Sequence, residues 1–218
     1  MMRLINAPPS PFGRKVAIAL HEKNLPFETQ WDEPWGEATI TGEYNPLAQL
    51  PILITDDGEV LYESTYLLEW IERRYPSPPL LPADDDGILA VKQLMVLAEG
   101  IMSSASTIIR ELTRPPSSEA WLARYRHKIA RATEVLDESI GGGDFAYGSR
   151  FGQADIAIGV NLKMVDTMTD LFGQQIEIDP WHERLPRLAA YVARIDERPS
   201  FVATRPQPMP FDHEKVYG

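Results

Sequence analysis

The chain has 218 residues, of which 44% are hydrophobic, so it is long enough to bury a sizeable core in one large domain or two small ones. Its net charge of −11 argues against nucleic acid as the main partner, because binding phosphates requires a basic surface. The absence of cysteine excludes disulfides, cysteine-ligated zinc and any thiol chemistry by the protein itself.

The first residues predict a strand followed by a helix. Residues 2–6 form a short apolar run, which two prolines end. Ser10 followed by Pro11 is typical of a helix start, because serine is a favoured N-cap and proline is best tolerated at the first helical position. Apolar residues at a spacing of four then indicate one buried helix face.

The following segments predict three more strands and another helix. Residues 27–31 alternate in hydrophobicity, and residues 32–49 indicate a loop with one short helix. Two apolar runs around an Asp-Gly turn predict a hairpin at 51–62. Residues 63–75 carry a helix pattern. The first third of the chain therefore has the order β-α-β-(α)-β-β-α.

Prolines then interrupt the chain, and only helix patterns follow. These helices are expected at residues 85–112, 117–140, 152–168 and 186–198. The fold class is a small α/β domain followed by an all-helical domain. We expect the boundaries to be 1–77 for the first domain, 78–85 for the linker, 86–204 for the helical domain and 205–218 for an extended tail.

The N-terminal sequence does not indicate a targeting or membrane segment. Its first ten residues lack a long apolar run, and no stretch reaches the roughly 18 apolar residues of a membrane span. We therefore expect a cytoplasmic protein without a membrane partner.

Five motifs in order resemble the glutathione transferases. They are "SPFGRKV" (10–16), "NPLAQLPIL" (45–53), "DGEVLYES" (57–64), "RFGQADIAI" (150–158) and "RIDERPSFVAT" (194–204). The resemblance covers about residues 2–204. It implies a thioredoxin-like first domain, a helical second domain, glutathione as co-substrate and a homodimer.

The "QLP" motif, residues 49–51, is expected to bind the glutathione backbone. From the sequence alone, a trans proline opening a strand is the more frequent form. The resemblance instead implies a cis bond between Leu50 and Pro51, which turns the Leu50 backbone toward the cysteinyl part of glutathione like an added strand. Gln49 adds a side-chain contact in this interpretation.

Glu63 and Ser64 are expected to bind the γ-glutamyl end. A helix start offers unpaired N–H groups and a partly positive end, which suit a carboxylate. Ser64 would contact that carboxylate through its N–H and hydroxyl, and Glu63 would accept from the ammonium. The alternative is an acidic helix start with a serine cap, a common arrangement.

The resemblance gives Ser10 a catalytic role beside its role as a cap. The residue at this place contacts the sulfur of glutathione in the family. Since a free thiol has a pKa near 8.5, a hydroxyl that donates to the sulfur favours the nucleophilic thiolate. Ser10 is thus expected to activate the thiol and not to attack.

Other side chains have simpler interpretations. Phe12, Trp35 and Met102 are candidates for the pocket of a small hydrophobic electrophile, although a core position is the commoner role for Met102. Arg14 and Lys15 are expected on a solvated helix face, with Arg14 a candidate assistant near the site. The four histidines have no ligand spacing, so no metal is assigned.

Asp155 is expected to support the first turn of its helix. Many family members have Ser or Thr three residues earlier, where this chain has Gly152.

The predicted function is a glutathione transferase, with glutathione-dependent peroxide reduction as a further activity of the same thiolate. Two alternatives stay open. One is a non-catalytic binding or regulatory module with this fold. The other is a glutathione-dependent isomerase or dehalogenase, which shares every motif of the first domain.

Overall fold

The computed structural model describes residues 1–114, 116–172, 176–178, 180–207 and 209. It divides into two compact units: residues 1–80 together with the described residues from Pro199 on, and residues 81–198. The division falls inside the predicted linker 78–85. It assigns residues 199–204 to the first unit, whereas the sequence analysis placed them in the helical domain.

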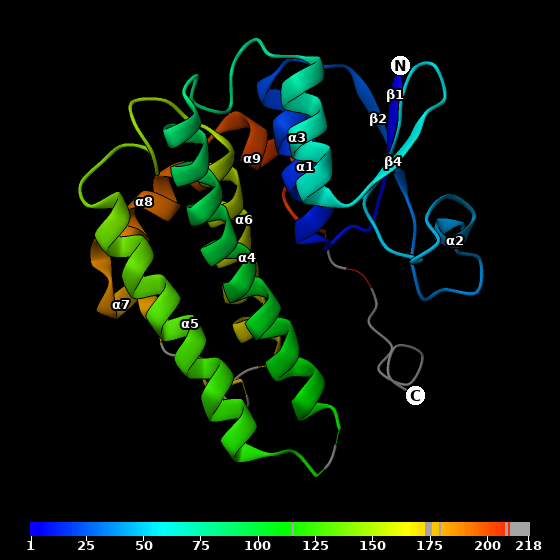
Figure 1. The fold of residues 1–218 in the computed structure, drawn as a ribbon. Helices are drawn as coiled ribbons and strands as arrows, with labels where there is room; N and C mark the ends of the chain where they lie inside the picture. The colour runs from blue at the N-terminus through cyan, green and yellow to red at the C-terminus, as the bar shows by residue number, and fades with distance from the viewer. Residues whose placement is uncertain (115, 173–175, 179, 208, 210–218) are drawn as a thin grey trace. The chain divides into compact units, whose positions relative to one another are not determined.

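The first unit is built on a four-stranded mixed sheet with the order β2-β1-β3-β4 (Figure 1). Strands β1 and β2 pair in parallel, and the other two pairs are antiparallel. The strands are β1 (Met2–Asn6), β2 (Phe27–Trp31), β3 (Ile52–Ile54) and β4 (Val60–Tyr62). All four predicted strands are confirmed.

Four helices belong to the first unit: α1 (Pro11–Glu22), α2 (Thr41–Tyr44), α3 (Ser64–Arg74) and α9 (Pro199–Ala203). Helix α1 packs against β1, α3 and α9, and Figure 1 shows α1 and α3 side by side against the sheet. The sequence did not predict α9, because Pro199 was interpreted only as the end of the preceding helix.

The prediction that Arg14 and Lys15 lie on a solvated helix face is wrong. Arg14 is 5% exposed and Lys15 is 0% exposed. Nine of the twelve residues of α1 are buried, because the helix is covered from several sides and has no wide solvent face. Arg14 donates from Nη2 to the Phe201 carbonyl at 3.2 Å, and its guanidinium lies 5.2 Å from the centre of the Phe201 ring.

The end of α1 is anchored by Lys23, whose side chain is fully buried. Its Nζ lies 2.7 Å from Glu72 Oε2 and donates to the carbonyls of Tyr75 and Pro78, also at 2.7 Å. Glu72 in turn accepts from the Leu80 amide at 3.1 Å. These contacts attach the chain after α3 to the end of α1, so Lys23 has a structural role.

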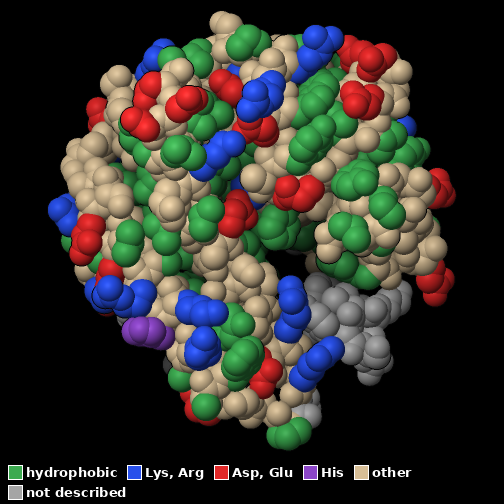
Figure 2. All heavy atoms as spheres, viewed as in Figure 1, with side chains coloured by type: hydrophobic (Ala, Val, Ile, Leu, Met, Phe, Trp, Pro, Cys, Tyr) green, Lys and Arg blue, Asp and Glu red, His purple; other side chains and the backbone are tan. Residues whose placement is uncertain are grey.

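The second unit is helical. Its helices are α4 (Asp85–Leu112), α5 (Glu119–Ile140), α6 (Gln153–Phe172), α7 (Trp181–Arg184) and α8 (Pro186–Asp196). Helix α4 contacts α5 and α6, and α8 contacts α5, α6 and α7. On the face seen in Figure 2, basic side chains gather toward the lower ends of α4 and α5, while both signs of charge mix above them.

Helix α4 is a long, apolar helix within the second unit. By length and composition alone it is apolar enough to cross a membrane. It is nevertheless packed against α5 and α6 along a buried stripe that includes Ala98, Ile101, Ala105 and Ile108. This is the packing of a core helix.

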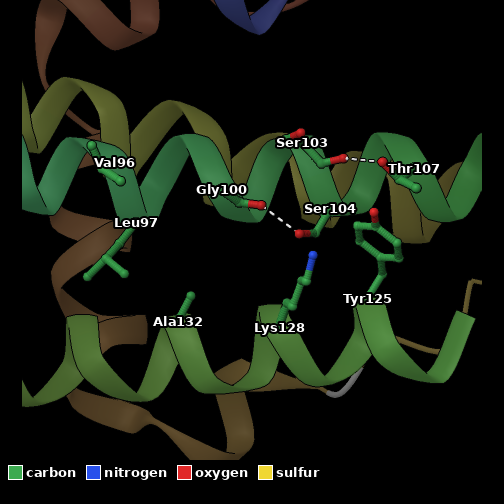
Figure 3. A pocket seen from close by; sticks show the side chains of 9 residues that line it. All are labelled: Val96, Leu97, Gly100, Ser103, Ser104, Thr107, Tyr125, Lys128 and Ala132. Carbon is green, nitrogen blue, oxygen red and sulfur yellow. Dashed lines mark hydrogen bonds between the residues drawn. The ribbon is translucent and has the colours of Figure 1, made fainter. Parts of the chain in front are cut away.

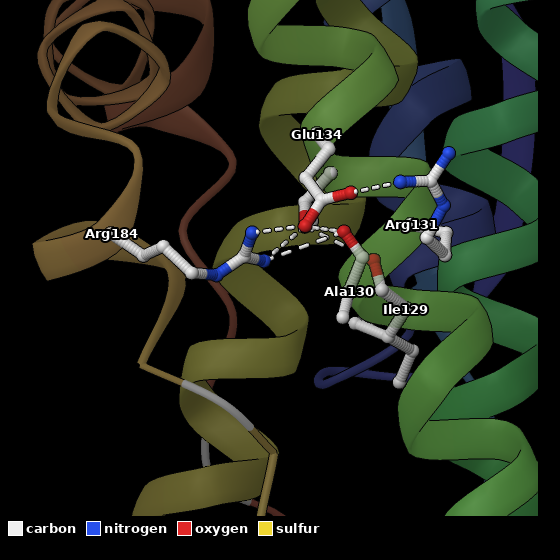
Figure 4. Close-up of polar contacts among 6 residues, drawn as sticks. Ile129, Ala130, Arg131, Glu134 and Arg184 are labelled. Atoms are coloured by element: carbon white, nitrogen blue, oxygen red, sulfur yellow. Dashed lines mark hydrogen bonds and ion pairs between the residues drawn. The ribbon is translucent and has the colours of Figure 1, made fainter.

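The short helix α7 is held against α5 by an ion pair and a hydrogen bond from Arg184. Arg184 Nη1 lies 2.7 Å from Glu134 Oε1, and Arg184 Nη2 donates to the Ala130 carbonyl (Figure 4). Arg131 binds the other oxygen of Glu134 at 2.7 Å. The sequence missed α7 because four residues are too few for a helix pattern.

Candidate functional site

Strand register brings three separate segments of the first unit to one end of the sheet. In the β1–β3 pair, Ile5 lies opposite Ile52, so the chain leaving β1 is beside the chain entering β3. In the β3–β4 pair, Ile52 lies opposite Tyr62, so the chain leaving β4 reaches the same end. The segments that hold Ser10, Leu50 and Glu63 therefore converge there.

Ser10 is the N-cap of α1, and its side chain is only partly used for capping. Its Oγ accepts from the Gly13 amide at 3.3 Å, near the long limit of a hydrogen bond. Among the described residues, none accepts the hydroxyl proton of Ser10, and the residue is half-buried. The hydroxyl thus has a proton to donate at the positive end of a helix.

Gly13 permits a close approach at this helix start. A Cβ at Gly13 would lie 1.8 Å from Asn6 Oδ1, well inside van der Waals contact. Asn6 is itself 5% exposed, and its Oδ1 has no hydrogen-bond partner among the described residues. The first turn of α1 therefore lies directly on the end of β1.

Glu63, not Ser64, caps helix α3. The Glu63 carboxylate accepts from the Thr65 amide at 3.0 Å and from the Tyr66 amide at 2.9 Å. Two of the N–H groups expected to be unpaired at this helix start are thus already paired with Glu63. Ser64 is 2% exposed, and its hydroxyl donates to Glu63 Oε1 at 3.3 Å.

The Glu63 carboxylate is held in its charged form. Desolvation raises the pKa of Glu63, but the hydrogen bonds from the Thr65 and Tyr66 amides and the charge of Lys15 outweigh it. The pKa therefore lies below its ordinary value of 4.5. The residue also has a φ of 78°, a conformation that costs free energy for any residue other than glycine. A strained, charged carboxylate at this end of the sheet suits a cationic group of a ligand.

The bond between Leu50 and Pro51 is cis, as predicted from the resemblance. Pro51 is buried, Leu50 is half-buried and Gln49 is exposed. The Gln49 carbonyl accepts from Asn45 Nδ2 at 2.7 Å, which fixes the loop before β3. The exposed side chain of Gln49 is available to a ligand.

The three candidates for the electrophile pocket are not brought together within one unit. Phe12 and Trp35 belong to the first unit; Phe12 is 38% exposed and Trp35 is half-buried. Met102 belongs to the second unit, in α4, and is 1% exposed. Its burial agrees with the core role that the sequence left open, and its part in a pocket stays a prediction.

The sequence missed one charged residue beside the site. Lys15 is completely buried in α1, and its Nζ lies 5.3 Å from the centre of the Phe12 ring. Its position in the "SPFGRKV" motif, five residues after Ser10, was the only signal. Residue type alone favoured an exposed lysine.

An acidic hollow of about 550 Å³ lies next to the segment after β1. Its lining includes Pro8, Trp31, Asp32, Glu33 and Glu37. Asp32 has a structural role there, because Thr39 donates to its Oδ2 at 2.8 Å and the Thr41 hydroxyl donates to the same oxygen. The carboxylates disfavour a negatively charged group in this hollow.

A second hollow lies within the helical unit, between α4 and α5 (Figure 3). The Ser104 hydroxyl donates to the Gly100 carbonyl at 2.7 Å, and the Thr107 hydroxyl donates to the Ser103 carbonyl at 2.9 Å. These protons are thus directed back to their own helix. Lys128 Nζ lies 4.2 Å from the centre of the Tyr125 ring. The described residues that line this hollow include no histidine or carboxylate to activate its hydroxyl groups, so it does not indicate hydrolase-type catalysis.

In the part of the chain that the structure describes, no group of three or more His, Asp or Glu side chains is placed to hold a metal ion. His213 lies outside the described residues, as does most of the predicted tail. Of that tail, residues 205–207 and 209 are described, without helix or strand, and the Gln207 amide donates to the Pro8 carbonyl at 3.2 Å.

Comparisons with known proteins agree with this geometry. The model of the glutathione S-transferase N-terminal domain matches residues 9–74, and that of the C-terminal domain matches residues 119–194. The uncharacterized GST-like protein YibF of Escherichia coli is 32% identical over 94% of this chain and 98% of its own.

Solved structures are also similar over nearly the whole chain. A glutathione S-transferase of Methylobacterium radiotolerans, in complex with glutathione sulfonate, has 38% identity and a TM-score of 0.88, covering 97% of both chains. One from Methylobacillus flagellatus with glutathione bound has 27% identity and a TM-score of 0.86, covering 95% of this chain and 100% of that one. With both domain models matched and relatives that align end to end, this chain belongs to the glutathione S-transferase family.

Proposed function

We propose that this protein is a glutathione transferase that activates the thiol of glutathione through Ser10. The observation that carries the proposal is the half-buried Ser10 hydroxyl at the start of α1, with one long capping contact of 3.3 Å and a proton left to donate. A hydroxyl at a positive helix end stabilises a thiolate more than a thiol.

Glutathione is proposed to lie across the end of the sheet where the three segments converge. Its cysteinyl backbone pairs with the backbone of Leu50, and Gln49 adds a side-chain contact. Its ammonium meets the charged Glu63 carboxylate, and its γ-glutamyl carboxylate meets the amide of Ser64. The glutathione sulfonate and glutathione bound by the two solved relatives support this choice of ligand.

The amide of Ser64 is the donor that the γ-glutamyl carboxylate requires. The amides of Thr65 and Tyr66 are already paired with Glu63. The Ser64 hydroxyl donates to the carboxylate of Glu63, so in this proposal it positions Glu63 and does not bind the ligand.

The reaction is a nucleophilic substitution or addition. The thiol proton leaves to solvent, the thiolate sulfur forms a bond to an electrophilic carbon, and in a substitution a leaving group such as chloride departs with the bonding electrons. Ser10 keeps its own proton and stabilises the charge on sulfur. Phe12 and Trp35, both in the first unit, are proposed to contact a small hydrophobic electrophile.

The test is conjugation of glutathione to a chlorinated nitroaromatic compound. Replacing Ser10 by Ala should lower kcat/KM at least tenfold and leave glutathione binding by calorimetry largely intact. Replacing Ser10 by Thr keeps a hydroxyl and a capping oxygen, so it is the matched control and should retain much of the rate. Equal rates for the wild type and the Ala variant would overturn the role of Ser10.

One observation favours an isomerase as the second candidate. The maleylpyruvate isomerase of Ralstonia is 34% identical over 99 residues, 44% of this chain. An isomerase needs the same thiolate, so a screen of unsaturated diacid substrates separates the two activities. An assay of peroxide reduction with glutathione as the reductant tests the proposed peroxidase activity.

A non-catalytic module is the remaining alternative, and the absence of glutathione binding in calorimetry would favour it. A cytoplasmic location, a part in detoxification and a homodimer belong to the proposal. Sedimentation analysis of the purified protein tests the homodimer.

A further inference from the structure

The ammonium group of Lys15 is buried in the second turn of α1, the helix whose start holds Ser10. Lys15 is 0% exposed, and its Nζ lies 5.3 Å from the centre of the Phe12 ring, three residues earlier in the same helix. Helical side chains lean toward the N-terminus of their helix. The charge of Lys15 is thus carried toward the first turn of α1, where Ser10 is the cap.

The same charge acts on the start of α3. Helices α1 and α3 pack together, and Glu63 is the N-cap of α3. Lys15 contributes to the lowered pKa of Glu63, so its field reaches that carboxylate. Lys15 therefore influences both helix starts that the proposed function assigns to glutathione.

We propose that Lys15 stabilises the negative charge on the sulfur of bound glutathione from inside the protein, as a positioning residue that does not contact the sulfur. This inference rests on the proposed function, because it requires glutathione at the start of α1. A buried charge is less screened by water and salt than an exposed one, so it acts at longer range. Ser10 supplies the direct hydrogen bond, and Lys15 supplies a fixed positive field.

Other charged residues on the elements packed against α1 also have contacts of their own. On α3, Glu72 is paired with Lys23 at the far end of α1, Glu69 is paired with Arg73 at 2.6 Å, and Arg74 is exposed. Strand β1 carries Arg3 near its start, and α9 has no charged residue.

On α1 itself, Arg14 is bound to Phe201, and Glu22 accepts from Ser200 at 2.5 Å near the end of the helix.

The test compares two ligands that differ in charge at the sulfur. Glutathione sulfonate is permanently negative there, and S-methylglutathione is neutral. Calorimetry gives the ratio of their dissociation constants, which is insensitive to a general loosening of the site. Lys15→Met should reduce the preference for the sulfonate on the order of tenfold, the effect of one charge about 10 Å away at an effective dielectric constant of about 20. Lys15→Arg should keep it.

Lys23→Met is the matched control, because it removes the other fully buried lysine side chain of this region, at the opposite end of α1. It should lower stability and leave the ligand ratio unchanged. If Lys15→Met does not fold, Lys15→Gln removes the charge while keeping a polar end.

Three results would overturn the proposal: an unchanged ratio in the uncharged variants, a ratio that falls equally in Lys15→Arg, or an equal fall in Lys23→Met. Failure of the wild-type protein to bind either ligand would instead refute the proposed function.

Discussion

The starts of α1 and α6 use capping chemistry in opposite ways. At α6, Asp155 is 1% exposed, and its carboxylate accepts from the Gly152 amide at 2.8 Å, the Ala146 amide at 2.7 Å and the Tyr191 hydroxyl at 2.5 Å. At α1, Ser10 is half-buried and accepts one bond of 3.3 Å. The Asp155 carboxylate uses its oxygens for hydrogen bonds within the fold, whereas the Ser10 hydroxyl still has a proton that it can donate to a ligand.

This difference explains how two similar sequence signals lead to different roles. Serine and aspartate are both good helix-start residues, so their type does not separate structure from function. The number and length of the hydrogen bonds that each side chain makes do distinguish a structural cap from a functional one. A residue whose polar atoms are all paired and buried stabilises the fold, because unpairing any of them costs free energy.

The largest expected effect is on stability at α6. Asp155→Ala removes two buried hydrogen bonds and one partly buried one, and it leaves two amides and a hydroxyl without their partner, so we expect a loss of about 3 kcal/mol in the free energy of unfolding. Urea denaturation measures it. Conjugation activity per folded molecule should not change. Asp170→Ala, at an exposed position on the same helix, is the control and should change stability by less than about 0.5 kcal/mol.

A smaller loss is expected from crowding the start of α1. Gly13→Ala places a Cβ where Asn6 Oδ1 lies, so the Asn6 side chain or the helix must move, at a cost of about 2 kcal/mol. Asn6→Ala in the same protein removes the obstacle. The double variant should then be more stable to urea than Gly13→Ala alone. If Asn6→Ala gives no such recovery, the close contact is not what limits this position.

Ser10→Ala should affect stability less than Asp155→Ala. Its single long bond predicts a loss of about 0.5–1 kcal/mol, at the low end of the range for an N-cap serine. The proposed loss of activity is at least tenfold, so rate and stability should separate clearly. A stability loss as large as that of Asp155→Ala would mean that Ser10 is mainly a structural cap.

The sequence predicted the regular elements well, because strands and long helices follow hydrophobic periodicity. All four strands and the helices from α1 to α6 were expected, as was α8, whereas α7 and α9 were too short to produce a pattern. The role of Asp155 at its helix start is confirmed through its bond to Gly152. Its bonds to Ala146 and Tyr191 depend on tertiary contacts that no local pattern contains.

The site was less predictable where burial depends on distant segments. Arg14 is buried because Phe201, 187 residues later, lies against it. Lys15 is buried because α1 is covered by other elements of its unit. That Glu63 and not Ser64 caps α3 was also not predictable from residue type, because serine is the better N-cap residue. In the structure Glu63 has a φ of 78°, and its carboxylate accepts from the Thr65 and Tyr66 amides.

The smallest expected effect is the pH dependence at the third cap, Glu63. Because its pKa in the folded protein lies below the ordinary 4.5, its charge stabilises the fold above that pH. This contribution is lost as the pH falls through the folded value. Glu63→Gln keeps the acceptor oxygen but not the charge, so we expect the wild type to be more stable at pH 7 by about 0.5 kcal/mol.

The difference between the wild type and Glu63→Gln should therefore shrink below pH 4.5 and disappear once Glu63 is protonated in the folded protein. Urea denaturation of both proteins between pH 3 and pH 7 measures it. A difference that stays constant over this range would show that the charge of Glu63 contributes nothing to the start of α3. The negative charge of Glu63 would then serve the proposed ligand alone, and in this respect the start of α3 would resemble the start of α1 more than that of α6.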